Sequence, residues 1–182
     1  MKGTEKRMKE ISLIKKSIFH DNISKLHLIE TVKSFIEQNK DQFTERSWDC
    51  NIHTSRNKFQ NILYDVEEFK YIKEEIEKKI KELIIKPFMI TSSWLNILGK
   101  NGYQEFHEHF DVKSDYKQGS ASFYLTKENS PIEFAYFAEK IIGELKITPN
   151  QGDIVIFDSN IYHRVVDSKD ERISLALNFI YL

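Results

Sequence analysis

The sequence predicts an α+β protein in which amino-terminal helices pack on one face of a double-stranded β-helix, the jelly-roll arrangement of antiparallel strands. Two observations predict it. Up to about residue 88 the chain has the apolar periodicity of amphipathic helices. From Met89 it changes to short strands rich in Ile, Val, Phe and Tyr, with no helices alternating between them, which favours antiparallel pairing. We therefore expect one domain, 1–182, with a mainly helical cover (1–88) and a jelly-roll core (89–182).

Composition excludes several classes of protein. The 182 residues are 40% hydrophobic and 30% charged, as in an ordinary globular domain. Lys and Arg number 27 against 28 Asp and Glu, so no overall charge attracts nucleic acid or acidic lipid. No segment is apolar for long enough to be a signal peptide or to cross a bilayer. The single cysteine, Cys50, has no partner for a disulfide, which agrees with the cytoplasmic location that we expect.

Two helices are predicted in the amino-terminal half. A shorter helix is expected near Leu26 to Ile36, with Ser24 as its N-cap. A second helix, of about twenty residues, is predicted by apolar positions three and four apart. Those positions are Val66, Phe69, Ile72, Ile76, Ile80 and Leu83. Pro87 ends this pattern because proline lacks the amide hydrogen that a helix needs.

The carboxy-terminal half reads as strands separated by turns such as GKNG, ENSP and PNQGD. The clearest strands are SASFYL (120–125), ELKIT (144–148), DIVIFD (153–158) and RISLALNFIYL (172–182). With only six glycines and no glycine-rich phosphate loop, the chain is unlike kinases and Rossmann proteins.

The run QEFHEHFD (104–111) contains candidate metal ligands. In a strand, residues i and i+2 share a face about 6.6 Å apart, whereas i and i+4 are about 13 Å apart. One ion can therefore bind His107 with His109, or His109 with Asp111, but not all three. The third ligand has to come from a distant strand, and His163 is the candidate. Two histidines and one carboxylate, as in His109, Asp111 and His163, form the facial triad of non-heme Fe(II) oxygenases.

Arg172 follows His163 by nine residues and shares one face of the last predicted strand with Ser174. A guanidinium that points into a barrel requires a carboxylate, and the sequence offers no obvious acidic partner there. A dicarboxylate such as 2-oxoglutarate would satisfy Arg172 and Ser174 at one end and the metal at the other. Tyr124, in SASFYL, would add a hydroxyl to the same carboxylate.

With these residues assembled, the chain resembles the 2-oxoglutarate- and Fe(II)-dependent oxygenase superfamily, and particularly its prolyl-hydroxylase-like branch. The resemblance rests on HFD, GDIVIFDSNIYH and RIS, which match an H-x-D pair, a distal histidine and an arginine nine residues later. Most of the chain is also similar to small oxygenases of phage and bacterial genomes, through WDCNIHTS, SSWLNI, GYQEFHEH and ERISLALNF.

The two resemblances place the near ligands differently. The small oxygenases align H-x-H with His107 and His109, whereas the prolyl hydroxylases align H-x-D with His109 and Asp111. We prefer the second alignment, because the carboxylate completes the usual ligand set.

The resemblance implies Fe(II) as cofactor and 2-oxoglutarate and O2 as cosubstrates, with ascorbate as an optional reductant. It implies hydroxylation of a small molecule or peptide, with release of succinate and CO2, and no catalytic residues beyond the metal ligands. Two alternatives stay open. One is a three-histidine, cupin-like metalloenzyme that uses His107, His109 and His163 without 2-oxoglutarate, and the other is a metal-free jelly-roll binding module. The sequence indicates neither the substrate nor the oligomeric state.

Overall fold

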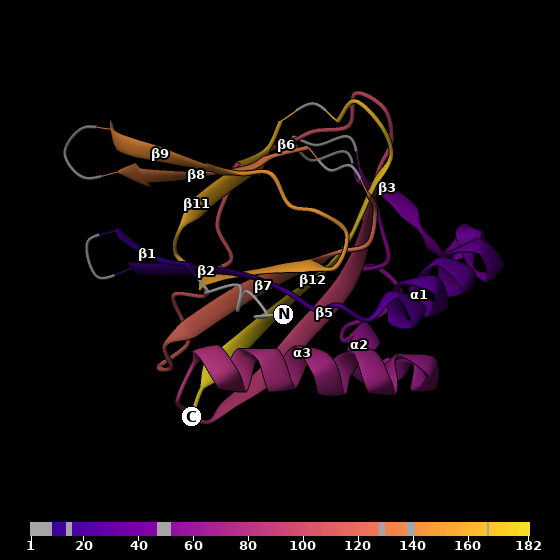
Figure 1. Cartoon of the computed structure of the whole chain (residues 1–182), viewed down its shortest axis with the longest axis horizontal. Helices are drawn as coiled ribbons and strands as arrows, with labels where there is room; N and C mark the ends of the chain where they lie inside the picture. Colours follow the sequence, from indigo (N-terminus) through magenta and orange to yellow (C-terminus); the bar gives the residue numbers. More distant parts are fainter. Residues whose placement is uncertain (1–8, 14–15, 47–51, 128–129, 138–140, 167) are drawn as a thin grey trace, which may run out of the picture.

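The strands form two sheets (Figure 1). The computed structural model describes residues 9–13, 16–46, 52–127, 130–137, 141–166 and 168–182. The larger sheet contains, in spatial order, β1 (Lys9–Leu13), β2 (Lys16–Asn22), β10 (Asp153–Asp158), β7 (Gln118–Tyr124), β12 (Arg172–Tyr181), β5 (Phe88–Leu98), β4 (Ile52–Thr54) and β3 (Thr44–Arg46). The smaller contains β6 (Gln104–His107), β11 (Tyr162–Val165), β8 (Ile132–Phe137) and β9 (Ile141–Ile147).

Every pairing between these strands is antiparallel in the described ranges. The result is the β-rich, jelly-roll-like core that the sequence predicts. All four segments singled out as strands are strands, although their ends differ from the predicted ends by up to three residues. Cys50 and the first two residues of the predicted ENSP turn lie outside the described residues.

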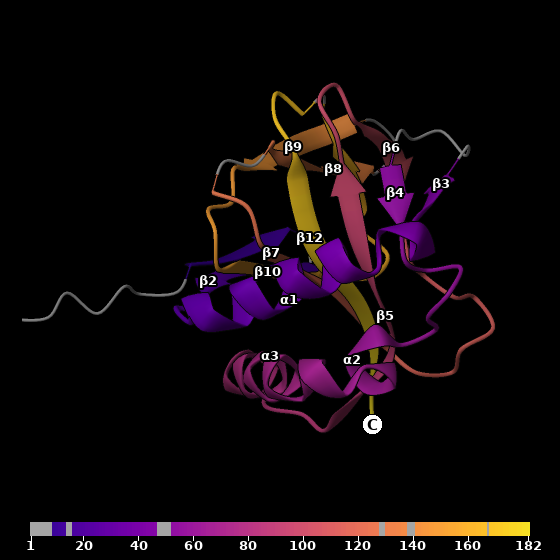
Figure 2. The same cartoon turned by 90° about the vertical axis from the view of Figure 1, so that its right-hand side faces the viewer.

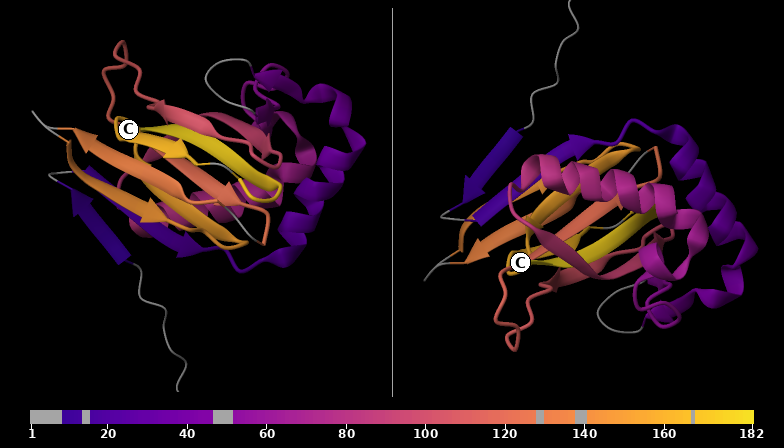
Figure 3. Two further views of the ribbon diagram at one scale, coloured as in Figure 1. Left: turned by 90° about the horizontal axis from the view of Figure 1, so that it is seen from above. Right: turned by 90° about the horizontal axis from the view of Figure 1, so that it is seen from below.

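Helices cover one face of the larger sheet. Figure 3, seen from below, shows α3 (Lys70–Leu83) lying across that sheet, and Figure 2 shows α1 (Leu26–Gln38) beside it. One hydrophobic cluster contains buried residues of α1, α3 and alternate positions of β7, β10 and β12. Among its members are Val32, Ile76, Phe123, Ile156 and Leu175. Burying each such side chain contributes about 1.5–3 kcal/mol. The opposite face of these strands is left to line the interior of the jelly roll.

The helix predictions need two corrections. The predicted twenty-residue helix is interrupted, because Val66 is extended (φ −117°, ψ 113°) and caps the short α2 (Ile62–Asp65). A 3₁₀ turn, Glu67–Phe69, then precedes the 14 residues of α3. Ser24 does not cap α1: its hydroxyl donates to Asn22 Oδ1, and Lys25 is the capping residue. None of the helices in the described part of the chain is long and apolar enough to span a membrane.

The amino-terminal half also contributes strands that its helical pattern did not predict. β2 pairs with β10, and β4 pairs with β5, so β1 to β4 extend both sides of the larger sheet. β3 and β4 have three residues each, too few for an alternating pattern to be recognised.

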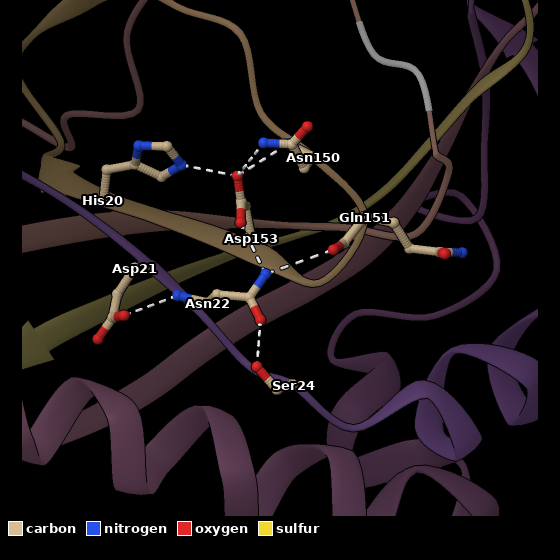
Figure 4. A network of polar contacts seen from close by, with 7 residues as sticks. All are labelled: His20, Asp21, Asn22, Ser24, Asn150, Gln151 and Asp153. Carbon is tan, nitrogen blue, oxygen red and sulfur yellow. Dashed lines mark hydrogen bonds and ion pairs between the residues drawn. The ribbon is translucent and has the colours of Figure 1, made fainter. Parts of the chain in front are cut away.

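A polar network joins β2 to the start of β10 (Figure 4). The buried Asp153 carboxylate accepts hydrogen bonds from His20 Nε2 (2.8 Å), Asn22 Nδ2 (2.7 Å) and the Asn150 amide (2.8 Å). Burial raises the pKa of Asp153, but these hydrogen bonds outweigh burial and lower it from 3.8 to about 2. The network fixes the turn before β10. Gly152 in that turn has φ +86°, a conformation that favours glycine.

Candidate active site

Three histidines meet between the two sheets. His107 ends β6 and lies directly opposite His163 on β11, and His109 follows β6 by two residues. One ligand atom from each of the three lies within 4.8 Å of the others. Two nitrogens that each bond an ion at about 2.1 Å are at most about 4.2 Å apart. Small side-chain adjustments would therefore let all three imidazoles bind one metal ion.

Aromatic side chains of both sheets surround this group. The ring of His163 lies 4.7 Å from Phe157 of β10 and 6.0 Å from Phe134 of β8. The ring of His109 lies 5.6 Å from Trp94 of β5. These contacts place the histidines against the inner face of the larger sheet, in apolar surroundings.

Backbone contacts select the nitrogen that would bind a metal. Nδ1 of His107 lies 2.8 Å from the Glu105 carbonyl oxygen, and Nδ1 of His163 lies 3.0 Å from that of Ile161. Because a carbonyl oxygen only accepts, each Nδ1 carries the proton, and Nε2 is the nitrogen that would bind a metal. Burial, followed by the charges of His107 and His109, lowers the pKa of His163 well below 6.5. His163 is therefore neutral near pH 7, as a metal ligand must be.

The structure does not bring Asp111 into this group. Its exposed carboxylate accepts a hydrogen bond from the Lys113 amide at 2.9 Å. Of the two near pairs allowed by the sequence, the structure gathers His107 with His109, and the preferred pair of His109 with Asp111 is not gathered. The physical reason is that β6 ends at His107, so strand alternation does not extend to residue 111.

Arg172 is buried on the interior face of β12. Its neighbour Ile173 belongs to the cluster on the helix side, so Arg172 points the other way. It is 2% exposed, and in the described part of the chain its Nε and Nη1 have no hydrogen-bond partner. A buried charge without compensation costs about 3–5 kcal/mol, which indicates that an anion belongs here. Burial lowers the pKa of Arg172, but arginine remains charged in proteins.

Two hydroxyls share the surroundings of Arg172. Tyr124 on β7 is paired with Ser174 on β12, and both side chains are buried. The Arg172 guanidinium lies 5.1 Å from the centre of the Tyr124 ring. The Tyr124 hydroxyl makes no hydrogen bond of normal length in the described residues. Burial raises the pKa of Tyr124 and outweighs the lowering effects of the neighbouring Arg172 and Ser122, so the hydroxyl stays protonated. Arg172 and Tyr124 therefore present donors without a partner in the described residues, beside the buried Ser174.

Sequence reasoning missed the residues that hold His109. Its amide donates to the Ser159 carbonyl oxygen at 2.9 Å. Asp111 lies two residues after His109, and the carboxamide of Gln118 is hydrogen-bonded to both its amide and its carbonyl oxygen. Contacts between side chains and backbone leave no periodic signal, so no pattern in the sequence indicates them.

No protein-family model matches the chain, and no curated protein matches it. Solved structures do match. A prolyl-4-hydroxylase from Pseudomonas putida is 13% identical over 90% of this chain and 91% of that one, with a TM-score of 0.64. HygX from Streptomyces hygroscopicus, with nickel and 2-oxoglutarate bound, is 9% identical over 90% of this chain and 82% of that one, with a TM-score of 0.68. The non-heme α-ketoglutarate-dependent epimerase SnoN of nogalamycin biosynthesis is 8% identical over 89% of this chain and 76% of that one, with a TM-score of 0.72.

The chain therefore has the fold of the 2-oxoglutarate- and Fe(II)-dependent oxygenases, which include prolyl hydroxylases. The predicted resemblance to this superfamily is confirmed at the level of the fold. Within that fold the chain carries three histidines that can bind a metal ion.

Proposed function

We propose that this chain is a 2-oxoglutarate- and Fe(II)-dependent oxygenase. In this proposal His107, His109 and His163 bind the metal, and Arg172, with Tyr124 and Ser174, binds the far carboxylate of 2-oxoglutarate. The observation that carries the proposal is Arg172, a buried guanidinium on the interior face with two nitrogens that lack a partner among the described residues.

The donors around Arg172 fit a carboxylate. A guanidinium presents parallel N–H groups that match the two oxygens of a carboxylate. The Tyr124 hydroxyl is a third donor, and the buried Ser174 lies directly opposite it on the neighbouring strand. The positive charge of Arg172 also contributes to the low pKa of His163, which supports a common interior for the two sites.

The three imidazoles fit a divalent metal of the iron type. The carbonyl oxygen of Glu105 orients the ring of His107, and that of Ile161 orients the ring of His163. In each ring Nε2 is then the atom that would coordinate the metal. Because all three ligands are neutral, they leave the full charge of the ion in place, which favours an anionic keto acid. Asp111 is not part of the proposed set, since its carboxylate bonds the Lys113 amide.

When bound, Fe(II) and 2-oxoglutarate would use O2 to hydroxylate a C–H bond of the substrate and to convert 2-oxoglutarate to succinate and CO2, with ascorbate as an optional reductant. The protein's contribution is binding and exclusion of water. Arg172 orients the cosubstrate along the interior, and the rings of Phe134, Phe157 and Trp94 keep the surroundings of the histidines apolar.

The all-histidine group also fits the alternative of a metalloenzyme that needs no keto acid. Arg172 distinguishes this alternative from the 2-oxoglutarate-dependent oxygenase, because only 2-oxoglutarate would give the buried guanidinium a ligand. The chemical difference is succinate, which only a 2-oxoglutarate-dependent enzyme forms.

The test measures succinate from 2-oxoglutarate with Fe(II) and O2 in the wild type, Arg172→Gln and Arg164→Gln. Arg164 is a matched control, because its guanidinium is already paired with Glu133 at 2.8 Å. We expect succinate from the wild type and Arg164→Gln, and a requirement for at least about 10-fold more 2-oxoglutarate in Arg172→Gln, since hydrogen bonds to charged groups contribute about 1.5–3 kcal/mol each. Wild-type protein that binds iron but forms no succinate would favour the keto-acid-independent enzyme. Protein that binds no metal would favour a binding module.

A further inference from the structure

His109 differs from the other two histidines in how its position is fixed. His107 and His163 lie in strands and are paired with each other. His109 lies beyond the last residue of β6, where no strand ladder constrains it. Its amide donates a hydrogen bond to the Ser159 carbonyl oxygen at 2.9 Å. A further constraint on this segment acts at Asp111, two residues along the chain.

Gln118, the first residue of β7, supplies that constraint. Its Oε1 accepts from the Asp111 amide at 2.8 Å, and its Nε2 donates to the Asp111 carbonyl oxygen at 2.8 Å. The carboxamide thus pairs with the amide and the carbonyl oxygen of Asp111, as the backbone of a neighbouring β-strand would. Gln118 is 9% exposed, so water competes little for these bonds.

The same residue is connected to His109 by a second route. The Gln118 carbonyl oxygen accepts from the Ser159 amide at 3.2 Å, and the Ser159 carbonyl oxygen accepts from His109. The Ser159 hydroxyl is hydrogen-bonded to the Ser120 hydroxyl at 2.8 Å, and the Ser120 hydroxyl donates to Asn178 Oδ1. Gln118 is therefore hydrogen-bonded to Asp111 directly and to His109 through Ser159, and the backbone from His109 to Asp111 closes this loop.

We propose that Gln118 is a positioning residue for the metal centre: its bonds to the Asp111 backbone hold His109 toward His107 and His163 and hold the Asp111 carboxylate away. This inference rests on the proposed function, because it assumes a metal among the three histidines. It goes beyond the proposed function by naming Gln118 as the residue that favours the H-x-H ligand pair over the H-x-D pair.

The test is anaerobic titration of the metal-free protein with Co(II), followed by calorimetry and by visible absorption of the bound ion. Gln118→Leu keeps the approximate size of the side chain and removes both hydrogen bonds. Gln151→Leu is the matched control: Gln151 Nε2 donates to the Leu125 carbonyl oxygen at 2.9 Å, at the opposite end of β10 from Ser159. Gln118→Glu, which keeps an acceptor for the Asp111 amide but opposes the Asp111 carbonyl oxygen, carries the test if Gln118→Leu does not fold.

We expect Gln118→Leu to bind Co(II) about 10–100-fold more weakly than the wild type, the usual range when groups that orient metal ligands are removed. Its saturated Co(II) spectrum should also differ, because the environment of the ion changes, whereas Gln151→Leu should match the wild type in both. Equal affinity and spectra in Gln118→Leu and Gln151→Leu would overturn the role of Gln118 and leave the metal centre standing. Failure of the wild type to bind Co(II) would instead contradict the metal centre itself.

Discussion

His107 and His163 occupy opposed positions on β6 and β11, with ring centroids 4.3 Å apart. Opposed residues of an antiparallel pair project from the same face of a sheet, so the ladder itself brings these two imidazoles together. His109 reaches them from outside the ladder. The three proposed ligands therefore depend on different parts of the structure, and substitutions separate their contributions.

Loss of His163 should strongly weaken metal binding. His163→Gln removes one of three nitrogens, and we expect Fe(II) or Co(II) affinity to fall by at least about 100-fold, because two imidazoles hold such an ion weakly. His53→Gln is the control, since His53 is exposed on β4 and lies outside the group. Calorimetric titration measures both. Tight one-to-one binding by His163→Gln would contradict the ligand assignment.

Asp111 distinguishes the two ligand registers. Asp111→Asn keeps an oxygen that can accept from the Lys113 amide and removes the charge. If His107, His109 and His163 are the ligands, we expect metal affinity within about two-fold of the wild type, an effect no larger than that of a surface substitution. A loss as large as that of His163→Gln would show that the carboxylate binds the metal and that the sequence-based preference for His109 with Asp111 was right.

Asp153 should make the fold sensitive to acid. Its pKa is lowered from 3.8 to about 2 on folding, so its contribution is present above pH 4 and is lost as the pH falls toward 2. That shift corresponds to about 2 kcal/mol. We expect Asp153→Asn to lower the free energy of unfolding at pH 7 and to approach the wild type near pH 2, as measured by urea denaturation. A difference between the two proteins that does not change with pH would contradict this.

Gly119 allows two strands to pack closely. It lies opposite Phe179, and an added Cβ would overlap with the tip of that ring. The ring is buried against Phe88 and Tyr181 and has little freedom to move. Gly119→Ala should therefore cost about 1–3 kcal/mol of stability. Gly99→Ala is the control, because no described residue other than its chain neighbours lies within 4 Å of its added Cβ. Similar melting temperatures for the two variants would disprove the close packing.

The sequence predicts most of what regular structure determines. The strand DIVIFD, the histidine after it, and the shared face of Arg172 and Ser174 follow from apolar runs and alternation, and the structure has them. In the structure the Asp111 carboxylate lies outside the histidine group, and its role as a metal ligand stays a prediction. That prediction assumed a strand through Asp111, but the chain leaves β6 at His107. Gln118 acts there through its side chain on a backbone seven residues away, a contact that no spacing rule records.

In the proposed function, one interior holds a metal at its histidines and 2-oxoglutarate at Arg172. Visible absorption under anaerobic conditions tests this claim most directly, with Fe(II) added first and 2-oxoglutarate second. A keto acid chelated to ferrous iron gives a metal-to-ligand charge-transfer band. We expect that band to grow to one equivalent of 2-oxoglutarate in the wild type and to need higher concentrations in Arg172→Gln. A folded wild-type protein that stays colourless after both additions would contradict the claim.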